Sequence, residues 1–213
     1  MFHRYSVRPI TRGECAHHVL NVHYAGRWPS ISYHFGLFRD NLLVGVATYG
    51  TPSSPTLRVG VAGEQYKNDV IELNRLVLTD NLINEASFLV GGSIKLLPKG
   101  KIIVSYADIS QGHIGYVYQA TNFLYCGLSA KRTDWAIKGK EHLHGTTLTD
   151  EFRGVPNRSV LVREKYGDDF YLKPRPRKHR YVYINGSKSF KRVVLRNLKY
   201  KIENYPKREV DDV

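Results

Sequence analysis

The stretch from Glu72 to Gly127 constrains the fold most, because runs of residues typical of strands alternate there with runs typical of helices. Apolar residues dominate positions 70–78 and 101–107, and both runs have the length of buried strands. Polar residues stand where one kind of run gives way to the other. Ligands of α/β folds collect at the carboxyl ends of strands, so we expect a functional site in this stretch.

Two helices are expected inside it. The first begins at Asn84, a residue type suited to the position before a helix, and ends at positions 98–100. Gly91 and Gly92 weaken this helix by up to about 1 kcal/mol each, and close approach of a strand or a ligand would explain them. The second helix follows His113 and places four residues on one face: Val117, Ala120, Thr121 and Leu124.

The remaining elements complete an α+β order. Residues 12–22 have helical spacing. Two strand-like runs, 32–38 and 42–49, are separated by a connection of hairpin length, and a further short strand is expected over 159–163. This order of elements is typical of an α+β fold rather than of a regular βαβ repeat: helix, hairpin, strand, helix, strand, helix and then more strand.

Three polar side chains follow the predicted strand 101–107 and are candidates for chemistry. Asp108 can serve as a general base or a metal ligand, since a carboxylate with a raised pKa takes a proton from an amine near neutral pH. Tyr118 can serve as an acid, and His113 adds an imidazole. The structural alternatives are an aspartate that caps a turn and an aromatic side chain that fills the core.

Arg75 stands in an apolar run beside Leu73, Leu76 and Val77. An unpaired charge is costly to bury, so an inward-facing arginine here needs a partner or an anionic ligand. An arginine that points to solvent from a sheet edge is the alternative.

Charge narrows the class of partner. The chain has 32 Lys and Arg against 19 Asp and Glu, a formal net charge of +13, and such an excess concentrates polyanions near the surface. Tyrosine and phenylalanine are interleaved with the cations near the carboxyl end, which suits phosphates and stacked bases; a solvated charged face is the alternative. The predicted nucleic-acid contacts are Arg175, Arg177, Lys178, Arg180, Tyr181, Lys188, Lys191 and Arg192.

The same composition suggests a division of the chain. We expect a catalytic core over 1–130, a basic insertion over 131–172 that completes the core sheet, and a basic, tyrosine-rich extension over 173–213; a single compact domain is the alternative. We see no secretory signal, no apolar run near the roughly 18 residues of a membrane span, and no CxxC pair. A cytoplasmic protein that contacts no membrane is expected.

Several motifs point to a known family. HYAGRWP, FGLFRDNLLVGVATYGTPSS, ELNRLVL, VSYADISQGHIGYVYQATNFLYCG and KPRPRKHRYVYINGSK occur in this order between His23 and Tyr205. Together they resemble the Mom family of phage DNA-modification proteins, and the SYAD to YQATN segment is the most distinctive part. GYVYQATNFLYCG also resembles the closing helix of the acetyl-CoA-dependent N-acetyltransferase (GNAT) superfamily, although the glycine-rich pyrophosphate loop of that superfamily is not evident after Leu78.

The resemblance implies a GNAT-like fold, with a central mixed, mostly antiparallel sheet flanked by helices and a basic carboxyl-terminal extension. It implies an enzyme that attaches a carbamoylmethyl (acetamido-type) group to N6 of adenine in double-stranded DNA, which blocks restriction endonucleases. Acetyl-CoA or a related acyl donor is the implied cofactor, and iron is the suggested metal. The target base would have to be flipped out of the duplex toward an aromatic side chain such as Trp28.

One residue is carried over from the resemblance: Tyr118 matches the tyrosine that protonates the departing thiolate in many GNAT members. With the residues weighed above, we predict a catalytic set of Asp108, Tyr118, Arg75 and Ser105. We predict a cofactor-binding set of Arg75, Leu76, Val77 and Asn122, and metal ligands His23, Tyr24 and Asp108. Two other functions stay open: a conventional N-acetyltransferase acting on a protein or small amine, and a nucleic-acid-binding protein without chemistry.

Overall fold

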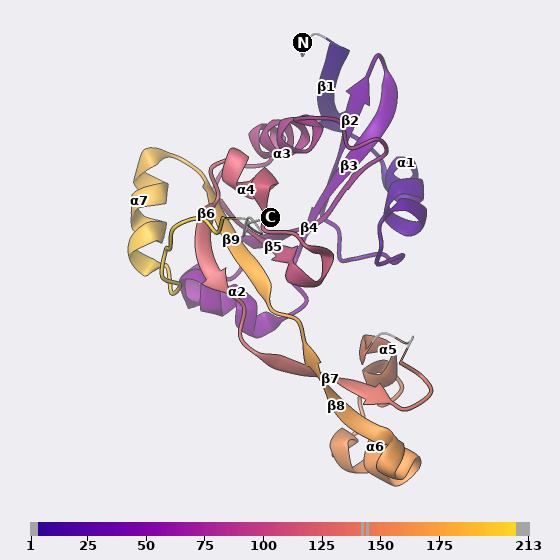
Figure 1. Ribbon diagram of the computed structural model, residues 1–213. Helices are drawn as coiled ribbons and strands as arrows, with labels where there is room; N and C mark the ends of the chain where they lie inside the picture. Colours follow the sequence, from indigo (N-terminus) through magenta and orange to yellow (C-terminus); the bar gives the residue numbers. More distant parts are fainter. Residues whose placement is uncertain (1–3, 142, 144, 208–213) are drawn as a thin grey trace, which may run out of the picture.

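The computed structural model describes residues 4–141, 143 and 145–207. Its main body is a seven-stranded sheet in the order β1-β2-β3-β4-β5-β9-β6 (Figure 1). The bounds of these strands are Tyr5–Pro9 for β1, Tyr33–Arg39 for β2, Leu42–Gly50 for β3, Val70–Leu78 for β4, Lys101–Asp108 for β5, Leu124–Leu128 for β6 and Lys178–Asn185 for β9.

One pairing in this sheet differs from all the others. The β1-β2, β2-β3, β3-β4, β5-β9 and β6-β9 pairs are antiparallel, whereas β4 and β5 are parallel. The parallel pair covers only Val70–Glu72 against Ile102–Val104, so the two strands separate toward their carboxyl ends. The predicted α+β fold with a mixed, mostly antiparallel sheet is confirmed.

Helices cover both faces of the sheet. The helices are α1 (Arg12–His17, continued by a π-helical turn over His18–Val22), α2 (Pro55–Ala62), α3 (Glu85–Leu96), α4 (Tyr116–Ala120) and α7 (Lys188–Asn197), with short 3-10 turns at Glu64–Tyr66, Ile109–Gln111 and Gly167–Asp169. Leu89 of α3 and Tyr118 of α4 belong to one buried cluster, and Val61 of α2 and Val194 of α7 belong to another. The sheet therefore separates an α3–α4 side from an α2–α7 side.

The two glycines of α3 have different surroundings. A side chain at Gly92 would lie 2.7 Å from Val7 of β1, whereas one at Gly91 would meet nothing within 4 Å. Close approach of a strand, one of the two expected explanations, accounts for Gly92.

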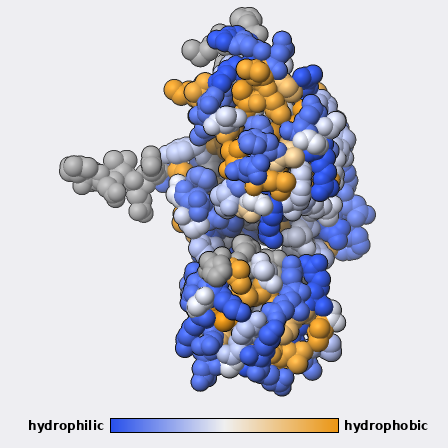
Figure 2. Space-filling model, turned by 90° about the vertical axis from the view of Figure 1, so that its right-hand side faces the viewer, coloured by the Kyte–Doolittle hydropathy of each residue, from blue (hydrophilic) through white to orange (hydrophobic). Residues whose placement is uncertain are grey.

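A separate lobe, which we call the arm, projects from one end of the sheet (Figure 1). It comprises β7 (Arg132–Ile137), α5 (Gly145–Asp150), α6 (Arg158–Tyr166) and β8 (Phe170–Arg175). β7 and β8 pair only with each other, and Phe152, Val162 and Phe170 form a small buried cluster of their own. Figure 2 shows the arm as a lower body joined to the core by a narrower region.

The structure corrects four expectations. The helix after His113 ends at Ala120, because Asn122 takes a left-handed backbone (φ 61°) and Leu124 begins β6. Residues 159–163 lie in α6 and not in a strand, since a short apolar run does not distinguish the two. The insertion 131–172 does not complete the core sheet, because its strands pair within the arm. The expected extension instead supplies the core strand β9, between β5 and β6.

None of the helices in the described part of the chain has the length and apolar character that a membrane crossing needs. The expected domain boundaries stay a prediction.

Candidate active site

The separation of β4 and β5 creates the candidate site. Immediately beyond the last parallel pair at Glu72, the Ser105 hydroxyl donates a 3.0 Å hydrogen bond to the carbonyl of Leu73 and ties the two strands together. We call the separation of β4 and β5 beyond Glu72 the split. A pocket opens on each side of the split, and the two pockets share Tyr24, Leu73, Asn74 and Tyr106. The fully buried Ser105 is therefore a link between the strands at the point where the pockets meet.

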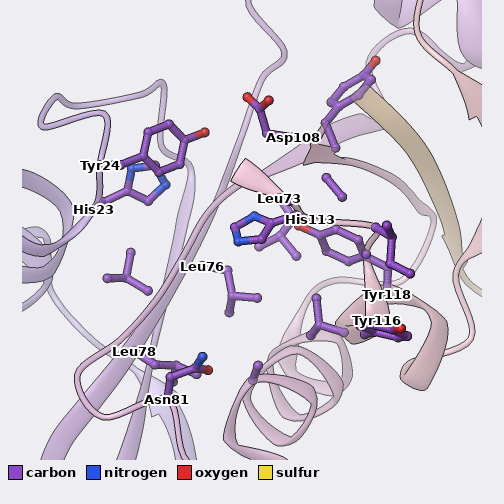
Figure 3. A pocket seen from close by; sticks show the side chains of 18 of the residues that line it. His23, Tyr24, Leu73, Leu76, Leu78, Asn81, Asp108, His113, Tyr116 and Tyr118 are labelled. Carbon is purple, nitrogen blue, oxygen red and sulfur yellow. The ribbon is translucent and has the colours of Figure 1, made fainter. Parts of the chain in front are cut away.

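The aromatic pocket lies toward α3 and α4 and has a volume of about 620 Å³ (Figure 3). Its lining includes His23, Tyr24, Leu76, Val77, Asp108, His113, Tyr116 and Tyr118. Apart from its histidines, Asp108 is the one charged side chain among the described residues of this lining, which holds no Lys or Arg. The pocket is suited to an uncharged group with aromatic or aliphatic contacts.

Tyr118 is placed by α4 and stays protonated at neutral pH. Its ring packs 5.4 Å from that of Phe123 and 5.1 Å from that of Tyr181, and its side chain is buried. Burial raises the pKa of Tyr118 to about 12, although a hydrogen bond with Ser105 lowers it in part. Its hydroxyl can therefore donate a proton to an atom in the aromatic pocket.

His23 and Tyr24 form a stacked pair at the edge of the split, with ring centroids 4.4 Å apart (Figure 3). The Nδ1 of His23 accepts a 3.0 Å hydrogen bond from the Ala25 amide, so the neutral ring carries its proton on Nε2. Burial, with the charges of Arg75 and Lys178, lowers the pKa of His23 to about 4. Tyr24 is 65% exposed and lines both pockets.

Asp108 is held in an ion pair. Its carboxylate accepts a 2.6 Å contact from Lys178 Nζ and hydrogen bonds from the Ser110 amide (3.0 Å) and hydroxyl (2.7 Å). Burial alone would raise its pKa, but hydrogen bonds from Lys178 and Ser110 outweigh burial and lower the pKa. The raised pKa that would favour Asp108 as a general base is therefore not found, and its role as a base stays a prediction.

The cationic pocket lies toward α2, at the base of the arm, and has a volume of about 500 Å³. Its cations are Arg75, Arg132, Arg175, Lys178 and Arg180. Arg75 donates to the carbonyls of Asn74 (2.7 Å) and Arg27 (3.0 Å). The Nε atoms of Arg75 and Arg180 are buried and have no hydrogen-bond partner among the described residues.

Glu72 is the functional candidate that sequence reasoning missed. It is the one acidic side chain among the described residues of the cationic pocket. Burial raises its pKa, and the charges of Arg75 and Lys178 oppose that rise. Its only signal in the sequence was an acidic residue inside the apolar run of β4, and the same run drew attention to Arg75 instead.

The other predicted residues do not gather in one place. Leu76 and Val77 line the aromatic pocket, but Asn122 lines a third pocket beside α3. Trp28 lines neither pocket of the split and packs under the guanidinium of Arg12, 4.4 Å from its ring. Tyr24 and Tyr106 are the aromatic side chains that line both pockets, and Tyr24 is the more exposed of the two.

The predicted nucleic-acid contacts divide into three groups. Arg175, Lys178 and Arg180 line the cationic pocket, and Arg177 donates to the carbonyls of Ser129 and Leu128. Lys188, Lys191 and Arg192 lie on α7 and line neither pocket of the split. Tyr181 is wrong as a contact, because its ring is fully buried and its hydroxyl donates to the Ile114 carbonyl.

The predicted iron site finds no support. Among the described residues, no group of three or more His, Cys, Asp or Glu side chains is arranged to hold a metal ion. Asp108 is engaged by Lys178 and Ser110, and His23 Nδ1 by a backbone amide.

Acetyl-CoA fits the site only in part. Beyond the parallel pair, the edge of β4 that faces β5 is open along the aromatic pocket and can receive an acyl arm. The amino terminus of α3, where a helix would bind a diphosphate, already holds the buried carboxylate of Glu85. The nucleotide part of acetyl-CoA therefore does not fit there.

Comparison with known proteins identifies the family. Residues 4–207 match the model of the Mom protein family. The chain is 30% identical over 191 residues to "Methylcarbamoylase mom" of Escherichia phage Mu, covering 87% of this chain and 76% of the relative. This chain belongs to the Mom family.

Two solved acetyltransferases are similar at a more distant level. Ribosomal-protein-S5-alanine acetyltransferase from Vibrio fischeri has a TM-score of 0.47 at 12% identity, over 87% of this chain and 95% of that one. Arabidopsis thaliana NAA60 in complex with acetyl-CoA has a TM-score of 0.48 at 12% identity, over 84% and 99% of the two chains.

Proposed function

We propose that this Mom-family protein attaches a carbamoylmethyl-type group to N6 of adenine in double-stranded DNA, in the bacterial cytoplasm, and so protects that DNA from restriction endonucleases. Membership of the Mom family and the 30% sequence identity to the phage Mu methylcarbamoylase support a modifying transferase. The observation that carries the proposal is the meeting of two unlike pockets at one split, a cationic one suited to nucleic acid and an aromatic one suited to a donor.

The cationic pocket supports DNA as the acceptor. Of its five cations, Lys178 is paired with Asp108 and Arg175 lies 3.7 Å from Asp134. Arg75, Arg132 and Arg180 remain against the single carboxylate of Glu72, an excess of positive charge that suits phosphate oxygens. Arg132 and Arg175 stand where the arm joins the core. A duplex seated here would contact the core and the arm together, and phosphate contacts of this kind supply affinity without sequence preference.

Tyr24 supports capture of a flipped base. Reaching N6 inside a duplex requires extrusion of the nucleotide, at a few kcal/mol, and stacking on an aromatic ring offsets part of that cost. One face of the Tyr24 ring stacks on His23, which holds it in place, and the side chain remains largely exposed. A base on the free face would lie between the two pockets that Tyr24 lines.

Glu72 and Tyr118 supply opposite proton functions. The N6 lone pair of adenine is delocalised into the ring, so the amine needs a base as its new bond forms. Glu72 faces the cationic pocket and its raised pKa makes it a stronger base than an ordinary carboxylate. Tyr118 faces the aromatic pocket in its protonated form. When two titratable groups lie in different environments, one can act as the base and the other as the acid.

Mass spectrometry of nucleosides tests the proposal. DNA from bacteria that express the chain should contain deoxyadenosine enlarged by a carbamoylmethyl group. Tyr118→Phe, which removes only one hydroxyl, should keep DNA binding and lose the modification. Unmodified adenine with the wild-type chain contradicts the proposal, and acylated protein lysines would indicate a conventional N-acetyltransferase.

The position of the duplex has its own test. Arg132→Gln with Arg175→Gln should flatten the salt dependence of DNA binding by about 0.9 in logarithmic slope for each phosphate that the protein no longer neutralises. Lys188→Gln with Arg192→Gln on α7 is the matched pair, which removes the same charge away from the split. An effect confined to the α7 pair would place the duplex on α7 instead.

A further inference from the structure

The amino terminus of α3 limits which donor the aromatic pocket can take. Glu85 is the first residue of α3, and its side chain is 1% exposed. One carboxylate oxygen accepts from the Leu82 amide at 3.0 Å; the other accepts from the Tyr5 hydroxyl at 3.0 Å and from Arg39 Nη1 at 3.1 Å. The first residue of α3 is therefore itself a buried anion, at the positive end of the helix dipole.

The loop that precedes α3 offers no cation of its own for a second anion. The loop from Thr79 to Asn84 reads TDNLIN and contains no Lys, Arg or Gly. Its one charged residue is Asp80, and Arg39 is shared between Asp80 and Glu85. A diphosphate at this point would lie among carboxylates, whereas the cations of the site lie on the other side of the split.

We infer that the donor is held in the aromatic pocket by an uncharged acyl arm alone, and that its carrier places no phosphate at the amino terminus of α3. The open edge of β4 offers backbone groups to such an arm, and Leu76 and Val77 offer apolar contact. The ligand class is a small carbonyl group on an uncharged arm, recognised without a nucleotide diphosphate; acetyl compounds that carry such an arm probe its binding and not the bond-forming step. The inference rests on the proposed function only in assigning the donor to this pocket.

Two ligands that share an acyl arm test this inference. Acetyl-CoA carries the nucleotide diphosphate and S-acetylpantetheine does not. Both are titrated calorimetrically into the full chain carrying Arg132→Gln and Arg175→Gln, which weakens phosphate binding in the cationic pocket. S-acetylpantetheine is expected to bind, and acetyl-CoA to show no advantage over it; a failure of S-acetylpantetheine to bind, or an advantage of acetyl-CoA of about tenfold or more, overturns the inference.

A variant with a reversed charge beside α3 tests the same inference, because it should create the phosphate site that the wild-type chain lacks. Asp80 is exposed and pairs with Arg39, so Asp80→Lys adds a cation beside α3, and Asp80→Asn, which removes the same ion pair without adding a cation, is its control. The Asp80→Lys variant should gain affinity for acetyl-CoA and none for S-acetylpantetheine; equal affinities before and after the change refute the charge argument. Because adenine modification is not measured, this inference and the proposed function fail independently.

Discussion

Glu72→Gln separates a catalytic carboxylate from a structural one, because the two roles predict opposite effects on stability. The substitution keeps the size and hydrogen-bonding shape of the side chain and removes its charge. If Glu72 takes the proton from N6, the rate of modification should fall about 10²- to 10⁴-fold, the usual contribution of a positioned base. This corresponds to about 2.7–5.5 kcal/mol in the activation barrier.

The stability of the same variant should rise. Burial raises the pKa of Glu72 in the folded chain above its ordinary value of 4.5, so folding favours the protonated form. Stability from such a group is fully present below the unfolded pKa and is lost as the pH rises through the folded pKa. At pH 7 the ionised carboxylate therefore destabilises the fold, and Glu72→Gln should exceed the wild type in free energy of unfolding. The difference should vanish as the pH falls below 4.5.

The assay has two parts. The modified fraction of deoxyadenosine is followed after induction in cells and normalised to the amount of protein, and urea unfolding of the purified chains is measured from pH 4 to 7 with a denaturant series. Glu164→Gln, at an exposed position of α6, is the control and should change neither quantity. A Glu72→Gln variant that modifies DNA at more than about a third of the wild-type rate refutes the assignment of the base.

Three further predictions follow from single interactions. Lys178→Met removes the 2.6 Å partner of Asp108, so the Asp108 pKa, read by carboxyl NMR titration, should rise. The accompanying loss of stability, about 1.5–3 kcal/mol at pH 7, should shrink as the pH falls through the lowered pKa of Asp108; an unmoved titration contradicts the ion pair. Gly115→Ala should cost about 2–4 kcal/mol in urea unfolding, because φ is +86° and the new carbon would lie 2.4 Å from the Tyr181 ring. Gly139→Ala has a similar φ of +77° but meets nothing within 4 Å, so equal costs would rule out the clash. Tyr24→Ala should lower the rate of modification by about 5- to 100-fold with an unchanged melting temperature, and Tyr24→Phe should keep the rate; equal loss in both variants would make the hydroxyl, and not stacking, the active feature.

The fold was predictable where apolar residues follow one clear pattern along the sequence. The hairpin, β4, α3 and β5 each have such a pattern, and their positions agree with the prediction to within a few residues. The expected end of the helix after His113 was wrong, because the stop before Asn122 depends on the left-handed backbone of that residue. The strand expected over 159–163 was also wrong, because short apolar runs suit either element. Pairing of β7 with β8 inside the arm is a tertiary choice that no local pattern specifies.

The position of the candidate site could be predicted from the sequence, but the ion pairs and pKa shifts of its carboxylates could not. Strand-end reasoning located Asp108 and Tyr118, and both line the aromatic pocket. The sequence could not show that Lys178, seventy positions later, neutralises Asp108 across the β5–β9 pair. For the same reason the sequence favoured Asp108 as the base, and Glu72 was passed over although it has the raised pKa.

The geometry of β9 explains why its sequence was misleading. Arginine, lysine and tyrosine are interleaved there, which suggested one nucleic-acid surface. Side chains of a strand alternate between the two faces of a sheet. Tyr181 and Tyr183 pack with the core on the α3–α4 side, whereas Val182 and Ile184 pack on the α2–α7 side. By the same alternation Lys178 and Arg180 join the α2–α7 side and reach the cationic pocket. One strand thus supplies aromatic support for Tyr118 on one face and cations for the proposed DNA acceptor on the other. Substitution of Arg180 should therefore lower DNA affinity, whereas substitution of the buried Tyr181 or Val182 should lower fold stability.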